Sequence, residues 1–421
     1  MTSFTVPFHD CEGRMRKSSR RDFLASAAGT SAVTFWVPKK VHGYSRAHVT
    51  DAKLMRGVSK WDLDTPALVL DLDKLEQNIA AMRTSLSATS VGARPHAKTH
   101  KSADIAKLQL AAGAVGICTA KLTEAETLSA EGIQKICMTT ANLSKAKILR
   151  AMNLRKKNRE FIQAVDYPQN AQDLSDAAKA AGITADVVVD VAVGTRSGIP
   201  AGDKALALAQ MIDKLPNLKF RGMLAYDGGA QHIKGYQARL TQSLERSADA
   251  VKTFERMKAS GLNVEIFSGG GTGTYNIMTK VPGFTDVQVG SYVFMDAQYL
   301  EIGNEKGDTF TDFASSLTVM ATIVNTYFPN RLTTDAGTKA LTLNKPDPIV
   351  LGEPGFRYTA GSDEFGTIQF DKANKTYKTG DKLELIIPHC DPVVNLYDVF
   401  YGVRNDKVEA VWPVTARGKS Q

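Results

Sequence analysis

Short apolar runs alternate with helical segments over residues 60–300, and this alternation narrows the choice of fold more than any other feature of the sequence. The runs are apolar throughout, as in ALVLDL (67–72), VGICTA (115–120) and DVVVDVAVG (186–194). Strands with no polar face are typical of parallel sheets that helices cover on both sides. About nine such runs occur, which predicts a closed (β/α)8 barrel of eight parallel strands, with one run left for another domain. An open doubly wound sheet is the alternative.

The pattern changes after residue 310. Runs such as SSLTVMATIVNTYF, FGTIQFDK and KVEAVWPV are rich in β-branched and aromatic residues, and turn signals such as NKPDP and RND separate them. Little helical periodicity remains, which predicts a separate antiparallel β domain. We therefore divide the chain into an N-terminal segment (1–49), a barrel domain (50–310) and a C-terminal β domain (311–421).

The N-terminal segment carries much of the positive charge. Of the net charge of +8, the first 50 residues supply five units, from eight basic and three acidic side chains. The remainder is only mildly basic, so the charge does not indicate nucleic-acid binding. In SSRRDFLASAAGTSAVTFWVP, paired Arg20 and Arg21 precede an apolar run that is too short for a stable membrane span. We expect a twin-arginine signal and export to the periplasm by the twin-arginine translocase; a basic tail followed by a short helix is the alternative.

Four cysteines in a chain of this length do not indicate a disulfide framework. Cys11 would leave with the export signal, and the remaining three are an odd number. Cys118 and Cys137 lie in the apolar runs VGICTA and KICMTT, where we expect buried strand cysteines.

The stretch RPHAKTHKS (94–102) gathers one Arg, two His and two Lys. Lys98 closes the strand-like run ARPHAK, and the active sites of barrel enzymes lie at the carboxyl ends of the strands. Neighbouring cations would destabilise its ammonium and favour imine formation. Lys101 stands where the next helix is expected to begin, and we expect it to face phosphate or solvent. A solvated basic loop is the alternative for the whole stretch.

Two glycine-containing loops follow apolar runs and are candidates for a phosphate site. SGGGTGTY (268–275) follows VEIF, and GSY (290–292) follows DVQV. Backbone N–H groups in such loops can approach a phosphate closely, because no Cβ stands in the way. A flexible turn is the alternative for each loop.

Five further side chains are candidates from their positions. Arg196 and Tyr226 each follow a predicted strand, and His232 lies six residues beyond Tyr226 on the same expected face. A surface arginine, a core tyrosine and a solvated histidine are the alternatives. His389 and Asp391 are separated by one residue, so on a strand both would project from one face, with Cys390 opposite. One imidazole and one carboxylate form half a site for a divalent ion, or else a surface hydrogen-bonded pair.

Several motifs together resemble the fold-type III pyridoxal-phosphate enzymes. DTPALVLDLDKLEQNI, RPHAKTHKS and GAVGICTAKLTEAE are similar to the branch of D-threonine aldolases and D-serine dehydratases, which has an alanine racemase-like barrel. The resemblance covers nearly all of residues 60–415. It implies that Lys98 carries pyridoxal phosphate covalently, that Arg196 meets the pyridine nitrogen, and that Tyr226 packs on or hydrogen-bonds the cofactor. The implied phosphate-binding residues are Gly270, Gly271, Thr272, Gly290 and Ser291.

The resemblance also separates two chemistries. The dehydratases carry His-x-Cys and the aldolases His-x-Asp, so the chain's His389, Cys390 and Asp391 follow the aldolase pattern. This implies a divalent metal on His389 and Asp391, with manganese first and magnesium, cobalt or zinc as alternatives. His232 matches the histidine that acts with the metal on the substrate hydroxyl. A homodimer in which each β domain completes the partner's site is also implied.

The implied activity is retro-aldol cleavage of D-β-hydroxy-α-amino acids, with D-threonine giving glycine and acetaldehyde. The first alternative is dehydration of D-serine or D-3-hydroxyaspartate to an α-keto acid and ammonia. The second is a pyridoxal-phosphate carrier without catalysis, against which the second domain and the His389–Asp391 pair argue. The chain departs from the family at Glu364–Gly366, where Phe365 replaces a frequent histidine, and this leaves the substrate side chain open.

Overall fold

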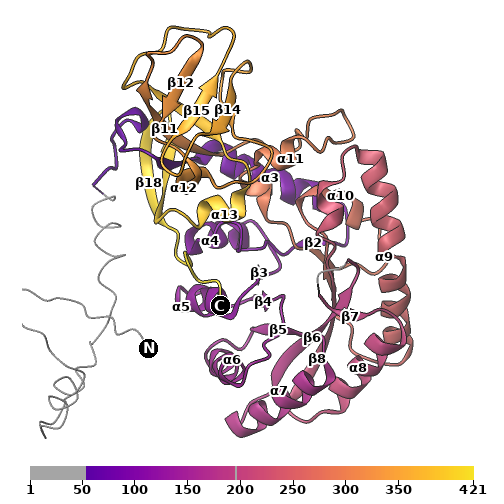
Figure 1. Ribbon diagram of the computed structural model, residues 1–421. Helices are drawn as coiled ribbons and strands as arrows, with labels where there is room; N and C mark the ends of the chain where they lie inside the picture. The colour runs from indigo at the N-terminus through magenta and orange to yellow at the C-terminus, as the bar shows by residue number, and fades with distance from the viewer. Residues whose placement is uncertain (1–53, 195–196) are drawn as a thin grey trace, which may run out of the picture. The chain divides into compact units, whose positions relative to one another are not determined.

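The computed structural model describes residues 54–194 and 197–421, all of which lie in one compact unit, Ser45–Gln421. The expected export signal with Arg20 and Arg21 lies outside these ranges. Two sheets organise the described chain, a parallel one and a mixed one, with the helices around the first (Figure 1). Within these ranges, no helix has both the length and the hydropathy needed to cross a bilayer.

The first sheet is a parallel barrel. In the described part of the chain its eight strands follow the order β2-β10-β9-β8-β6-β5-β4-β3, and the short β7 (Ile199–Pro200) pairs with β6. The N–H of Val115 donates to the Ala93 oxygen and that of Cys118 to the Pro95 oxygen, so the last strand meets the first. The strands are β2 (Gly92–Ala93), β3 (Ile117–Thr119), β4 (Ile136–Met138), β5 (Ile162–Val165), β6 (Ala185–Ala192), β8 (Leu218–Ala225), β9 (Ile266–Gly269) and β10 (Asp286–Val287). The predicted closed barrel is therefore confirmed.

Amphipathic helices cover the outside of the barrel (Figure 1). Local signals set their ends: Asp71 caps the first of them by accepting the N–H of Lys74 at 3.0 Å, and Gly182 ends another at φ 64°. The helices are α3 (Leu72–Leu86), α4 (Ala103–Ala111), α5 (Leu122–Ala130), α6 (Lys145–Lys157), α7 (Pro168–Ala181), α8 (Asp203–Lys214) and α9 (Tyr236–Ala259). Short helices near the site are η2 (Gly229–His232), η3 (Thr272–Thr274), α10 (Tyr275–Met278), η4 (Ser291–Val293), α11 (Ala297–Leu300) and α13 (Cys390–Val394).

The second sheet belongs to the C-terminal domain but also takes in the first strand of the described chain. β1 (Ala67–Asp71) pairs antiparallel with β11 (Leu317–Asn325) and parallel with β17 (Val399–Arg404). The sheet is thus mixed, and the run at 67–72 is the one that the barrel does not use. The remaining strands are β12 (Arg331–Thr334), β13 (Ile349–Val350), β14 (Arg357–Ala360), β15 (Gly366–Gln369), β16 (Lys382–Ile386) and β18 (Lys407–Pro413), and the remaining short helices are η1 (Lys60–Asp62) and α12 (Thr338–Leu341).

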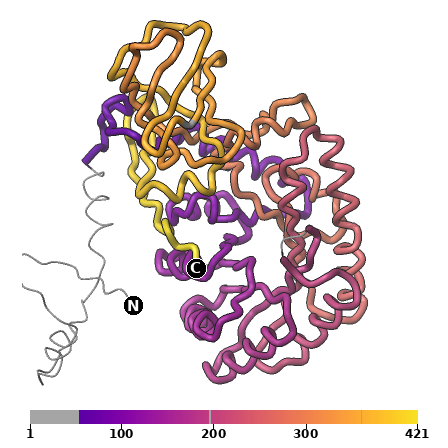
Figure 2. Tube along the Cα trace, in the orientation of Figure 1, coloured from indigo at the N-terminus to yellow at the C-terminus, as the bar shows by residue number. Residues whose placement is uncertain are grey.

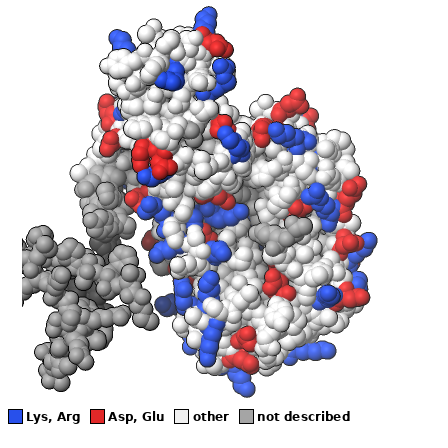
Figure 3. All heavy atoms as spheres, viewed as in Figure 1, with Lys and Arg blue, Asp and Glu red and all other residues white. Residues whose placement is uncertain are grey.

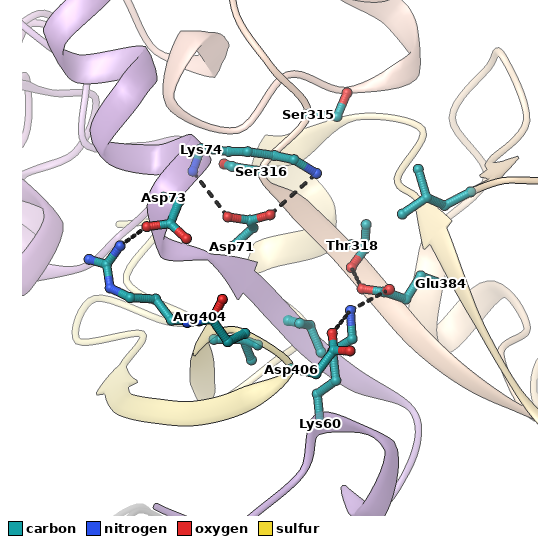
Figure 4. Close-up of a pocket in the computed structure, with 14 residues that line it drawn as sticks. Lys60, Asp71, Asp73, Lys74, Ser315, Ser316, Thr318, Glu384, Arg404 and Asp406 are labelled. Carbon is teal, nitrogen blue, oxygen red and sulfur yellow. Dashed lines mark hydrogen bonds and ion pairs between the residues drawn. The ribbon is translucent and has the colours of Figure 1, made fainter. Parts of the chain in front are cut away.

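Charged side chains fasten η1 to this sheet around a cavity of about 220 Å³ (Figure 4). Nζ of Lys60 lies 2.8 Å from Glu384 and 3.0 Å from Asp406, and Glu384 also accepts the hydroxyl of Thr318. Around this cavity the charges pair with one another, which indicates a structural role. On the visible face in Figure 3, positive and negative side chains are interspersed over both the barrel and the C-terminal domain.

The C-terminal segment returns from the second sheet to the barrel helices, as the yellow end of the trace in Figure 2 shows. The N–H of Ala416 donates to the oxygen of Lys101 at 2.8 Å, and the N–H of Thr123 donates to the oxygen of Gln421 at 3.1 Å. The first bond connects the C-terminal segment to the loop that follows β2, where Lys98 lies, and the second connects it to α5.

Candidate active site

Lys98 lies in the turn after β2, at the carboxyl end of the barrel strand. Its Nζ is 3.3 Å from Oδ2 of Asp391 and 6.0 Å from the centroid of the Tyr226 ring, and its side chain is 36% exposed. Tyr226 directly follows β8, so a second barrel strand delivers it to the same edge. The sequence placed other cations near Lys98, and the structure adds a carboxylate from the other domain.

Lys101 does not face phosphate or solvent, and this expectation was wrong. It is buried and its Nζ lies 2.5 Å from Oε1 of Glu124. Glu124 in turn accepts the backbone N–H groups of Ala120 and Lys121 at the start of α5. Lys101 therefore anchors the loop, and Lys98 is the one whose amine reaches the site.

The two histidines of the same loop are packed into the barrel. His100 is fully buried and accepts the N–H of Ser102 at Nδ1, and burial lowers its pKa to about 4. His96 is also buried, with Nε2 3.3 Å from the hydroxyl of Thr139. Both rings are therefore buried and contribute to the packing of the loop.

The two glycine loops lie side by side, because β9 and β10 are neighbouring parallel strands. Gly270 has φ 60°, a conformation that favours glycine, and it turns the chain into η3. The hydroxyl of Thr272 accepts the N–H of Tyr292, which ties the first loop to the second. Ser291 begins η4 and is buried.

At two of these glycines the chain packs too closely against neighbouring side chains for any larger residue. A Cβ on Gly290 would lie 2.4 Å from Oγ1 of Thr99, and one on Gly271 would lie 2.7 Å from Oε1 of Gln231. The Thr99 hydroxyl is buried and has no hydrogen-bond partner within the described ranges. A narrow cradle of backbone groups with an unsatisfied hydroxyl beside it fits the phosphate of pyridoxal phosphate.

Arg196, the expected partner of the pyridine nitrogen, lies outside the described residues.

His389 and Asp391 come together, but not by the strand alternation that the sequence suggested. His389 is extended, with φ −149° and ψ 132°, and is the N-cap of α13, whose first turn contains Asp391. Cys390 is fully buried, and burial raises the pKa of its thiol, so the thiol stays neutral. A helix start therefore presents the histidine and the carboxylate, and the cysteine packs inward.

The Asp391 carboxylate remains ionised although it is largely buried. Burial opposes its charge, but the positive charge of Lys98, the His389 ring and the nearby Thr99 hydroxyl lower its pKa to about 2. Thr99 stands close without meeting hydrogen-bond geometry, so Oδ1 of Asp391 is buried with no partner among the described residues. An ionised carboxylate with a free oxygen next to an imidazole fits a divalent cation.

No cluster of three or more metal-binding side chains occurs in the ranges that the structure describes. The His389–Asp391 pair would therefore hold a metal together with water or substrate oxygens, as catalytic ions with open positions are held.

His232 ends η2, on the loop that follows β8. Its ring is exposed to solvent on one side, and the ring centroid lies 4.8 Å from that of Tyr299. The protein packed against the ring lowers the pKa of His232, and the charges of Asp296 and Asp391 oppose this shift. His232 is thus close to the His389–Asp391 pair, and a neutral His232 ring can accept a proton.

Sequence reasoning missed three residues of the site, namely Thr99, Gln231 and Asp296. Gln231 accepts the N–H of Gly273 and donates to Thr274, so it supports the first glycine loop from the His232 side. Asp296 accepts hydrogen bonds from His389 and Cys390. A lone Asp before the short helical stretch AQYL was the one sequence signal for Asp296.

Comparisons with known proteins agree with this geometry. The sequence matches the family "Alanine racemase, N-terminal domain" over residues 70–298 and a "Putative serine dehydratase domain" over residues 316–403. It is 36% identical over 373 residues to 3-hydroxy-D-aspartate aldolase of Paracoccus denitrificans (strain Pd 1222), with 88% of this chain and 96% of the relative covered. It is 37% identical over 360 residues to D-threonine aldolase of Arthrobacter sp, with 85% and 94% covered.

A solved structure agrees as well. The crystal structure of D-threonine aldolase from Filomicrobium marinum has a TM-score of 0.83 and 34% identity to the chain, and the match covers 87% of this chain and 99% of that one. The barrel, the second domain and the sequence therefore all match this crystal structure over 87% of the chain. The chain belongs to the fold-type III, alanine racemase-like family of pyridoxal-phosphate enzymes, with D-threonine aldolases and D-serine or 3-hydroxyaspartate dehydratases among its members.

Proposed function

We propose that the protein is a pyridoxal-phosphate- and divalent-metal-dependent aldolase that cleaves D-β-hydroxy-α-amino acids, converting D-threonine to glycine and acetaldehyde. The observation that carries the proposal is the 3.3 Å contact between Nζ of Lys98 and Oδ2 of Asp391. It joins the lysine suited to the cofactor to the carboxylate suited to the metal. Relatives with aldolase names over nearly their whole length support the same class.

The cofactor residues are those at the carboxyl edge of the barrel. Lys98 would hold the cofactor covalently, the loops at Gly270–Thr272 and Gly290–Ser291 would bind its phosphate, and Tyr226 would lie against its ring. Arg196 is proposed for the pyridine nitrogen from its sequence pattern. When bound, pyridoxal phosphate accepts the electrons of a bond that breaks at the substrate Cα.

The metal residues act on the substrate hydroxyl. His389 and Asp391 would hold a divalent ion, with manganese proposed first, which would lower the pKa of a substrate hydroxyl in contact with it. His232 would accept the proton, since burial on one side keeps the pKa of its ring low and its other side is open. Removal of that proton drives cleavage of the Cα–Cβ bond and release of an aldehyde. Tyr299 orients the His232 ring by packing against it.

D-Threonine is the leading substrate, and 3-hydroxy-D-aspartate is the second, because relatives of both kinds match the chain equally well. Dehydration is the competing reaction, since the C-terminal domain also matches a putative serine dehydratase domain. Aspartate at position 391 supports cleavage because it follows the His-x-Asp pattern of the aldolases. As a harder ligand than a thiolate, it suits manganese better than the zinc of the dehydratases.

Purified protein incubated with D-threonine, pyridoxal phosphate and Mn²⁺ tests the proposal. We expect acetaldehyde from D-threonine and none from L-threonine, and loss of activity on metal chelation that added Mn²⁺ restores. His389→Ala should abolish turnover but leave the cofactor absorbance intact. Formation of 2-oxobutyrate without acetaldehyde would refute the aldolase assignment, and full activity of His389→Ala would refute the metal site.

We also propose export and dimerisation. The twin-arginine pattern at Arg20 and Arg21 supports transport of the folded enzyme to the periplasm, and cell fractionation of the full chain tests it. The family resemblance supports a homodimer, which analytical ultracentrifugation of the purified protein tests. A cytoplasmic fraction or a monomer would contradict the respective proposal.

A further inference from the structure

Asp296 connects the barrel to the histidine that we propose as a metal ligand. It lies directly before α11, and its Oδ1 accepts the N–H of Tyr299 at 3.0 Å, which caps that helix. Its Oδ2 lies 3.0 Å from Nδ1 of His389 and accepts the N–H of Cys390 at 2.8 Å. The carboxylate is fully buried, so these groups make up its surroundings in place of water.

The contact decides which nitrogen of His389 carries a proton. Both oxygens of Asp296 already accept backbone N–H groups, from Tyr299 and Cys390, so the carboxylate is the acceptor and Nδ1 is the donor. A neutral imidazole with its proton on Nδ1 has its lone pair on Nε2, and a metal needs that lone pair. We propose that Asp296 is a positioning residue that fixes the ring of His389 so that Nε2 is the metal-binding atom.

The backbone around Asp296 makes this a fixed arrangement. The N–H of Ala297 donates to the oxygen of Ile387 at 2.9 Å, and that of Gln298 to the oxygen of Pro388 at 3.2 Å. The start of α11 is therefore bonded to the two residues before His389. Met295, with φ 51°, turns the chain sharply just before Asp296. The backbone segments that carry Asp296 and His389 are therefore hydrogen-bonded to each other, which holds the two side chains together.

A capping role alone would not require the second oxygen to meet His389. The helix cap uses Oδ1, whereas Oδ2 faces His389 and accepts the N–H of the residue after it. A carboxylate behind a metal-binding imidazole holds the ring orientation and increases its basicity, and loss of such a partner weakens metal binding about 10- to 100-fold. The inference rests on the proposed function, because it assumes a metal on His389.

The test measures the affinity of the metal-stripped holoenzyme for Mn²⁺. The electron paramagnetic resonance signal of free Mn²⁺ reports how much of the ion remains unbound. In Asp296→Asn, an amide N–H₂ replaces one oxygen and faces a donor, so we expect affinity about 10- to 100-fold weaker with cofactor absorbance unchanged. The matched control is Asp71→Asn, which alters another Asp cap, that of α3, and should bind Mn²⁺ as the wild type does.

Equal Mn²⁺ affinity of Asp296→Asn and the wild type would overturn the inference and leave the proposed function standing. A wild type that binds no Mn²⁺ would overturn both. A second measurement does not depend on the folding of Asp296→Asn. Long-range ¹H–¹⁵N correlation is recorded on the histidine rings of the metal-free wild type at alkaline pH, and His389→Gln assigns the signal of His389. We expect the proton of His389 on Nδ1, and a proton on Nε2 would overturn the inference.

Discussion

Lys101 and Glu124 form an ion pair at 2.5 Å with side chains 7% and 3% exposed, three residues beyond Lys98. Glu124 also holds the first turn of α5, and the oxygen of Lys101 accepts the N–H of Ala416 from the C-terminal segment. The pair joins three parts of the chain beneath the site. The two lysines of this short motif are therefore placed differently: Lys101 is held in a buried ion pair, and Lys98 faces Asp391 in the candidate site.

Lys98→Ala should remove the covalent link to the cofactor and lower turnover by about 10³-fold or more, because Lys101, the other lysine of the motif, is held by Glu124. Borohydride reduction followed by peptide mass spectrometry identifies the modified residue. In the wild type we expect the label on the peptide that contains Lys98. A label on Lys101 would contradict the assignment.

Lys101→Met is the matched control for that experiment. It leaves Glu124 buried without its partner, which costs on the order of 3–5 kcal/mol in the free energy of unfolding. The variant should still carry the label on Lys98 wherever it is folded. Urea unfolding measures the loss of stability, and unchanged stability would show that the ion pair does not anchor the loop.

Gly290→Ala should weaken cofactor binding, because its Cβ would lie 2.4 Å from the hydroxyl of Thr99 and push into the phosphate cradle. We expect the apparent Kd for pyridoxal phosphate to rise by about tenfold or more, equivalent to about 1.4 kcal/mol. Fluorescence titration of the apoenzyme measures it. Gly307→Ala is the control, since no atom lies within 4 Å of a Cβ there. Equal affinity of Gly290→Ala and the control would remove Gly290 from the phosphate site.

His100 should make stability depend on pH below neutrality. Burial lowers the pKa of its ring from 6.5 to about 4, so between these values the unfolded chain binds a proton that the folded chain does not. The free energy of unfolding should therefore fall as the pH drops from about 6.5 to about 4, by up to about 1.4 kcal/mol per unit from this residue. His100→Gln should flatten the profile in urea unfolding, and an equally steep profile would contradict the assignment.

Lys60→Met should loosen the attachment of η1 to the second sheet, since Glu384 and Asp406 both lose their cation (Figure 4). We expect a loss of about 1.5–3 kcal/mol in the free energy of unfolding. Lys339→Met, which breaks an exposed pair with Glu364, should cause no measurable loss. Equal stability of Lys60→Met and the wild type would show that this contact does not stabilise the fold.

The sequence predicted the barrel well because its strands are apolar on both faces, a pattern that few other folds require. It also predicted a spare strand, but pairing of β1 with both β11 and β17 depends on contacts about 250 and 330 residues apart, which no local pattern encodes.

The sequence predicted the candidate site less completely than it predicted the fold. Motif order pointed to Lys98 and the His389–Asp391 pair, and the structure places Lys98 beside Asp391. The strand assumed around His389 is a helix start. The burial of Lys101 was missed because its partner, Glu124, comes from the next βα unit. Asp296 was missed for the same reason, since its contact with His389 spans 93 positions and only the folded chain brings the two together.

Product analysis of one reaction tests the central claim most directly. Wild-type protein with pyridoxal phosphate and Mn²⁺ is given D-threonine, and glycine, acetaldehyde, 2-oxobutyrate and ammonia are measured in the same sample. The account predicts glycine and acetaldehyde in equal amounts, each matching the D-threonine consumed. Equal amounts of 2-oxobutyrate and ammonia, without glycine, would contradict it.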